Sequence, residues 1–235
     1  MLPGYSGLMG GPTGDTASVQ RVSADHPGVN ELFALLAYGE VAAFYRLTDE
    51  ARMAPDLRGR INMARMAAAE MGHYELLRQT LETRGVDVLA AMTRYASALE
   101  NYHRLTMPST WLEALVKTYV GDAMAADLYL ALAGSLPDEV ADVVRSVLAE
   151  TVHSQFVVAE VRSAVTSSGK QRSRLALWSR RLLGEAITQA QYVLADHDEL
   201  VDLVLAGSGG LGQLTDFYDR MQRTHDDRMR QLGLA

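Results

Sequence analysis

The stretch "AAAEMGHYELL", residues 67–77, places a glutamate and a histidine inside an otherwise apolar, helix-favouring run. Glu70 and His73 are three residues apart, so on an α-helix they lie on one face, about one turn from each other. A charged pair among alanine, methionine and leucine is either a tolerated ion pair or half of a metal site. A single copy of the pattern does not decide between the two, so a second copy is the deciding observation.

The pattern occurs again 80 residues later in "LAETVHSQF", where Glu150 and His153 are three residues apart. A lone acid precedes each pair, Glu40 in "AYGEVAAFY" and Asp122 in "YVGDAMAADLY", and each acid directly follows a glycine. Four carboxylates inside a helical bundle balance the charge of two divalent metal ions, whereas unpaired buried carboxylates would be costly. The spacing therefore predicts a di-metal centre with six ligands, namely Glu40, Glu70, His73, Asp122, Glu150 and His153.

The types of ligand limit the metal. The chain has no cysteine, which excludes thiolate chemistry and iron–sulfur clusters. Oxygen and imidazole ligands suit iron, manganese or zinc. We expect the glutamates of the two Glu-x-x-His pairs to bridge the metal ions and the two lone acids to cap them.

The ligand on the third predicted helix has two candidates. Asp127 lies five residues after Asp122, which places it about 140° around the helix, so the two cannot both be ligands in the same way. We expect Asp122 to be the ligand because it matches Glu40 in the other helix pair. Asp127 and Glu185 are candidates to hydrogen-bond the metal-bound histidines, or they form ordinary polar pairs.

Composition and periodicity predict an all-α fold. Alanine and leucine dominate, and no segment alternates like a strand. Helices are predicted over about 30–52, 56–85, 111–134, 138–165, 172–196, 197–206 and 213–231, with a shorter helix inside the connection 86–109. Two short-looped helix pairs joined by one long crossover between helices 2 and 3 match the ferritin-like class of four-helix bundle.

The chain is expected to form one domain behind a tail. Residues 1–28 are rich in glycine, proline and serine and are expected to be a flexible tail. Residues 29–168 would form the bundle, and residues 169–235 would add C-terminal helices packed on it. The chain has no long apolar run and no basic segment at its start, so a cytoplasmic protein without membrane contact is expected.

The net charge of −7 argues against a strongly basic, non-specific nucleic-acid binder. The most basic stretch is "KQRSRLALWSRRLL", residues 170–183. It is either a solvated helix face or a contact for RNA or another anionic substrate.

Four motifs carry a resemblance to a known family: "LLAYGEVAAFYRL", "MAAAEMGHYELL", "TYVGDAMAADLY" and "GEAITQAQ". They resemble the actinobacterial ferritin-like proteins related to the tRNA hydroxylase that acts on 2-methylthio-isopentenyl-adenosine, over about residues 29–232. The resemblance implies a non-haem di-iron hydroxylase that uses two iron ions, O2 and an electron donor, with a modified tRNA nucleoside as candidate substrate. That hydroxylase has a glutamate on the third helix, and the shorter Asp122 can change the metal spacing or open a coordination site.

Two other functions fit the same pattern. One is a ferritin-like ferroxidase or peroxide-consuming protein, and the other is a non-catalytic helical protein that acts through partners. The glycines beside the predicted ligands, Gly39, Gly72 and Gly121, also allow two interpretations: close contact between helices, or room for a substrate or a ligand shift.

Overall fold

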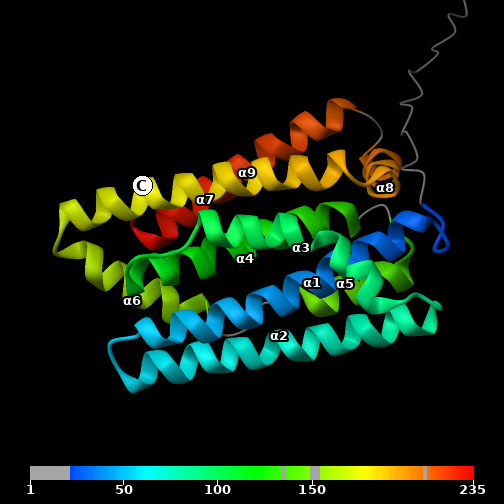
Figure 1. Cartoon of the computed structure of the whole chain (residues 1–235). Helices are drawn as coiled ribbons and strands as arrows, with labels where there is room; N and C mark the ends of the chain where they lie inside the picture. Colours follow the sequence, from blue (N-terminus) through cyan, green and yellow to red (C-terminus); the bar gives the residue numbers. More distant parts are fainter. Residues whose placement is uncertain (1–21, 134–135, 149–153, 209–210) are drawn as a thin grey trace, which may run out of the picture.

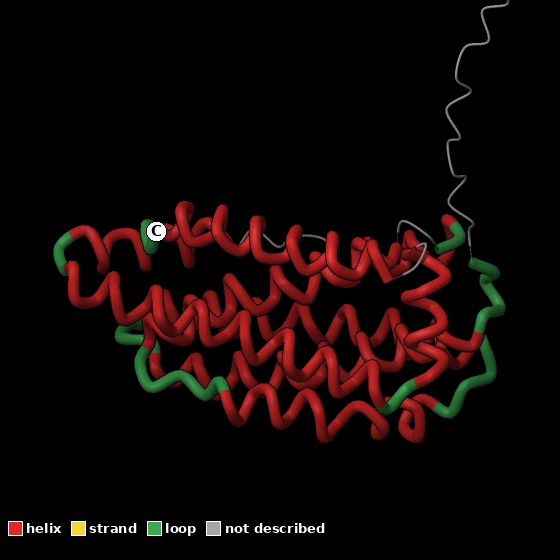
Figure 2. The backbone as a smooth tube through the Cα atoms, turned by 90° about the horizontal axis from the view of Figure 1, so that it is seen from above, coloured by secondary structure: helices red, strands yellow, loops and turns green. Residues whose placement is uncertain are grey.

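The computed structural model describes residues 22–133, 136–148, 154–208 and 211–235, and every regular element in these ranges is a helix (Figure 2). The all-α prediction is therefore confirmed. The helices are α1 (Pro27–Glu50), the 3-10 turn η1 (Ala51–Met53), α2 (Leu57–Thr83), α3 (Val88–Leu105), α4 (Trp111–Ala133), α5 (Asp138–Val147), α6 (Ser154–Thr166), α7 (Gly169–Ala195), α8 (Asp198–Ser208) and α9 (Leu211–Leu232).

Local sequence signals set the helix ends. Asp56 caps the start of α2 by accepting a hydrogen bond from a backbone N–H three residues on, at 2.8 Å. Gly85 follows α2 with a φ of +73°, a left-handed conformation that ends the helix and that glycine adopts readily. At the start of α4, Thr110 accepts a hydrogen bond from the N–H of Glu113 at 3.3 Å, and the Glu113 carboxylate accepts one from the N–H of Ser109 at 2.7 Å. Thr110 thus caps α4 with its side chain.

The long helices lie side by side as an elongated bundle, and α8 runs across one end of it (Figure 1). α1 and α2 form an antiparallel pair with a short connection, and α2 lies at the edge of the bundle. α4 packs mainly against α7, α6 and α9, while α3 packs against both α1 and α7. The long connection between the second and third bundle helices is thus largely helical and forms part of the packed structure. None of the described helices combines the length and the apolar character that crossing a bilayer requires.

The helix expected over 138–165 is not continuous in the structure. α5 ends at Val147, and the described chain resumes within α6, with residues 149–153 outside the described residues. The two halves pack in different clusters of the core: α5 buries Val140, Val144 and Val147 in one cluster, and α6 buries Val157, Val161 and Val165 in the other. Both halves have a helical pattern, so periodicity alone did not reveal the interruption.

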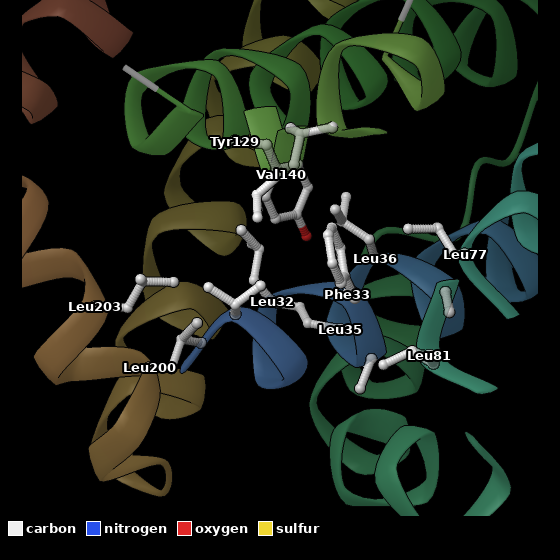
Figure 3. Packing of buried hydrophobic residues seen from close by; sticks show 14 of the residues in the cluster. Leu32, Phe33, Leu35, Leu36, Leu77, Leu81, Tyr129, Val140, Leu200 and Leu203 are labelled. Atoms are coloured by element: carbon white, nitrogen blue, oxygen red, sulfur yellow. The ribbon is translucent and has the colours of Figure 1, made fainter. Parts of the chain in front are cut away.

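Two apolar clusters form the core. The first core cluster surrounds the N-terminal half of α1, where Phe33 and Leu36 pack with Leu77 and Leu81 of α2 and with Tyr129 of α4 (Figure 3). The second core cluster contains buried side chains of the other half of the bundle, including Leu47, Met63, Leu115, Val161 and Leu182. Between the buried members of these clusters lie residues 38–46 of α1 and 68–76 of α2. The predicted ligands on both helices fall in these two gaps.

Gly28 provides a test of the packing between α1 and α8. A Cβ at this position would lie 2.3 Å from the carbonyl oxygen of Glu199 and 2.7 Å from the Cβ of Leu203. We expect Gly28→Ala to lower the free energy of unfolding by about 1–3 kcal/mol, because neither backbone nor Cβ can move aside cheaply. Urea denaturation followed by circular dichroism measures the change.

Gly184 in α7 is the matched control, because a Cβ there would meet no described atom within 4 Å. Gly184→Ala should raise stability by about 0.5–1 kcal/mol through helix propensity. Equal effects at both positions would contradict the close packing of α1 on α8.

Candidate metal centre

Three of the predicted ligands, Glu40 on α1 and Glu70 and His73 on α2, converge in the structure. Each offers one ligand atom, and these atoms all lie within 4.8 Å of one another. The Nδ1 atom of His73 lies 3.3 Å from Oε2 of Glu40 and 3.5 Å from Oε2 of Glu70. The antiparallel pairing of α1 and α2 brings Glu40 to the level of the Glu-x-x-His turn. Because Glu40 is buried and the other two are half-buried, the group is largely shielded from water.

The three groups are electrostatically coupled. Burial raises the pKa of Glu40 to about 9. Hydrogen bonds with Glu40 and Glu70 raise the pKa of His73 to about 10. Burial opposes ionisation of Glu70, but hydrogen bonds with His73 and Glu40 and the charge of Arg46 outweigh it and lower the pKa of Glu70. At neutral pH the metal-free group therefore holds a neutral Glu40, an anionic Glu70 and a cationic His73, which together carry no net charge.

The donor set fits a divalent transition metal. Two carboxylates and one imidazole supply the oxygen and nitrogen ligands that iron, manganese or zinc take. The protons on Glu40 and His73 are those that a metal ion would displace, because a ligand binds a metal in its deprotonated form. The group thus combines suitable ligand chemistry with a charge that metal binding can balance.

The other half of the predicted centre lies outside the described residues. Glu150 and His153 fall within 149–153, and the side chain of Asp122 is likewise not described, although its backbone belongs to α4. The role of these three residues as ligands stays a prediction, as does metal binding by the first three.

Asp127, the alternative to Asp122, has a different role in the structure. Its carboxylate accepts two hydrogen bonds from the guanidinium of Arg228, at 2.6 and 2.9 Å, and one from Thr224 at 2.9 Å. This arrangement ties α4 to α9. Neither Asp127 nor the half-buried Glu185 belongs to the described group of potential metal ligands.

A buried polar cluster that the sequence analysis missed connects α1 to α4. Arg46 donates to Glu50 at 3.1 Å and to Thr118 at 3.0 Å, while Nζ of Lys117 lies 3.7 Å from Glu50. All four side chains are buried, and Arg46 is close enough to Glu70 for its charge to lower the pKa of that carboxyl. Arg46 and Glu50 are four residues apart, so in the sequence they look like an ordinary exposed helix pair.

The tyrosines near the predicted ligands differ in their surroundings. Tyr129 is buried in the first core cluster, and burial together with the charge of Glu40 raises the pKa of Tyr129. Tyr45 is 65% exposed, and Tyr119 donates a hydrogen bond to Gln231 on α9. The charge of the candidate site therefore acts on the hydroxyl of Tyr129.

The glycines beside the predicted ligands also differ. A Cβ at Gly39 would lie 3.7 Å from Leu99, and one at Gly121 would lie 3.3 Å from the hydroxyl of Tyr102. Both glycines therefore face α3 at close range, which favours the helix-contact interpretation. Gly72 is exposed, and a Cβ there would meet no described atom within 4 Å.

Part of the basic stretch on α7 serves contacts within the chain. Arg174 pairs with Glu113 at 2.9 Å, and Arg181 donates to the carbonyl of Leu105 at 2.7 Å. Arg172 and Arg180 are exposed on the same helix. The stretch thus has a structural part and a part that faces solvent.

A comparison with protein-family models matches residues 22–207 to a family described as ferritin-like domain of actinomycetes. All six predicted ligands lie within this range. A comparison with curated proteins finds no match.

The shifted pKa values predict how stability depends on pH. In an unfolded chain the carboxyl of Glu40 and the imidazole of His73 would titrate near 4.5 and 6.5. Between about pH 6.5 and 9 the folded metal-free protein therefore holds protons that the unfolded chain has released, so stability falls as pH rises. We expect the melting temperature, measured in a chelator, to fall by several degrees over this range.

The control is the Glu40→Gln/His73→Gln double variant, which lacks both titrating groups and should show a much flatter profile. A wild-type melting temperature that stays constant or rises over this range would contradict the coupling described above.

Proposed function

The chain belongs to the ferritin-like domain family of actinomycetes, and on that premise we propose that it is a non-haem di-iron protein that hydroxylates an organic substrate with O2. The observation that carries the proposal is the convergence of Glu40, Glu70 and His73 between α1 and α2. The residues that would hold the two iron ions are Glu40, Glu70, His73, Asp122, Glu150 and His153. Bound iron would supply the activation of O2 and the oxidation of a C–H bond.

The described residues would prepare the site for this chemistry. Glu40 and Glu70 provide negative charge, and His73 becomes a neutral ligand once its proton is displaced. Arg46 favours the ionised form of Glu70, which is the form that binds a metal. The first and second core clusters lie on either side of this group and keep bulk water away from it.

The substrate and the partners belong to the same proposal. The four motifs that resemble the tRNA-hydroxylase-related proteins support a modified tRNA nucleoside as substrate. Arg172 and Arg180, exposed on α7, offer cationic contacts to phosphate groups. An electron donor would complete the reaction, and the proposed location is the cytoplasm.

Iron content tests the metal centre. After anaerobic reconstitution with Fe(II) and desalting, the wild type should retain about two irons per chain. Glu70→Ala and Asp122→Asn should each lose iron because each removes a proposed ligand. Asp127→Asn is the matched control on the same helix as Asp122, because its carboxylate binds Arg228 in the structure. Circular dichroism checks that each variant is folded.

Iron bound equally by wild type and both ligand variants, or no iron bound by the wild type, would contradict the proposed centre. Equal loss in Asp127→Asn and Asp122→Asn would contradict the assignment of Asp122.

Product analysis tests the reaction class. Iron-loaded protein, a reductant, O2 and bulk tRNA carrying thiomethylated and prenylated adenosines should yield a nucleoside heavier by one oxygen atom, detected by mass spectrometry. O2 consumption that requires only Fe(II) or peroxide and is indifferent to added substrate would instead support a ferroxidase or peroxide-consuming protein and contradict the hydroxylase.

A further inference from the structure

The outer face of α2 carries a row of apolar residues although it faces solvent. The exposed apolar residues are Leu57, Ile61, Ala64, Ala68, Gly72 and Leu76, and the exposed polar residues Arg65, Glu75 and Gln79 lie on the same side. Spacings of three and four residues place them along one side of the helix. The opposite side buries Met63, Leu77 and Leu81 in the core. α2 lies at the edge of the bundle (Figure 1), so this second apolar face has no described helix packed over it. A row of exposed apolar side chains opposite the buried side of a helix is typical of a helix that packs on both sides.

Gly72 is a second feature of α2 that is consistent with a helix packed on its outer face. A glycine in the interior of a helix costs about 0.5–1 kcal/mol relative to alanine. Gly39 and Gly121 each face α3 closely, but a side chain at Gly72 would meet no described atom within 4 Å. The described packing therefore gives no reason for glycine at this position, whereas a second helix packed on the outer face would.

The charged residues along this face would attract each other if two copies of α2 packed antiparallel. Arg58 and Arg60 are exposed beside the N-terminal part of the apolar face, and residues 57–69 contain no acid. Glu75 and Glu82 are exposed in the C-terminal part, where both form ion pairs with Arg78 of the same helix. Two parallel copies of α2 would place arginine against arginine. Two antiparallel copies would place Arg58 and Arg60 near Glu75 of the second copy, which favours association.

We propose that the chain forms a homodimer through the outer face of α2, with the two α2 helices antiparallel about a two-fold axis that passes between Ala64 and Ala68. In this register Leu57 lies opposite Leu76 of the second copy, and Ile61 lies opposite Gly72 of the second copy. The glycine leaves the space that the isoleucine side chain fills. Such an interface uses the same patch on both copies, as two-fold symmetry requires.

Molecular mass in solution tests the dimer. Analytical ultracentrifugation of the full chain, whose mass is 25.7 kDa, should give twice that mass at micromolar concentration. Ala68→Arg should give the monomer because it places a second arginine opposite Arg65 of the other copy, near the two-fold axis. Leu177→Glu on α7, a residue that is 63% exposed, is the matched control and should leave the dimer intact.

A wild-type monomer, or a dimer that Ala68→Arg leaves unchanged, would overturn the proposal. A monomer that instead floats with anionic phosphatidylglycerol vesicles would assign the face to a membrane surface and would also overturn it.

Cysteine crosslinking tests the direction, and the chain has no native cysteine to interfere. A helical rise of 1.5 Å per residue places the two copies of position 68 about 5 Å apart along the antiparallel pair, and the two copies of position 57 about 28 Å apart. Under an added oxidant, Ala68→Cys should form a disulfide-linked dimer and Leu57→Cys should not. Crosslinking at both positions would show a parallel arrangement and overturn the register.

A charge reversal tests the flanking contacts. Arg58→Glu/Arg60→Glu should weaken dimerisation about tenfold because it places acids against Glu75 of the second copy, a cost set by a few exposed charge pairs. Adding Glu75→Arg should recover most of the affinity. A triple variant no tighter than the double variant would contradict the antiparallel pairing.

Discussion

Placing two carboxyl groups and an imidazole between apolar clusters is the constraint on which the rest of the structure depends. Charges removed from water are costly unless they are paired or bind a metal. In the metal-free protein, Glu40, Glu70 and His73 share protons so that the group is neutral. This sharing requires α1 and α2 to be antiparallel and in one particular register. The packing of the first and second core clusters on either side of the group holds that register.

Further buried or half-buried polar contacts lie beyond this group, on α1 and α4. Arg46 lies six residues beyond Glu40 on α1, and it donates hydrogen bonds to Glu50 of the same helix and to Thr118 of α4. On α4, Asp127 binds Arg228 of α9. α1 and α4 are thus each joined to a neighbouring helix by buried or half-buried polar contacts. These contacts fix helix register more sharply than apolar packing, because ion pairs and hydrogen bonds depend on direction.

Much of the fold follows from local rules that the sequence displays. Gly85 and Asp56 mark the two ends of α2, because capping depends on nearby residues only. The proximity of Glu40 to Glu70 and His73 follows from helical spacing and a short connection. The end of the helix at Val147 could not be predicted from these local rules. It depends on which core cluster each half of 138–165 packs against. The buried pair of Arg46 and Glu50 has the spacing of a surface pair, and only tertiary packing distinguishes the two.

Part of the candidate site could likewise be predicted from the sequence, and part required the structure. The sequence pattern names six ligands, and the structure brings together the three of them whose side chains it describes. The carboxylate of Asp127 binds Arg228, an outcome that helix geometry alone left open.

The most direct test of the central claim is the anomalous scattering of crystals of the iron-loaded protein, measured on both sides of the iron absorption edge. The account predicts two iron peaks about 3.5–4 Å apart, one of them in contact with Glu40, Glu70 and His73. Crystals of iron-loaded protein with no peak between α1 and α2 would contradict it.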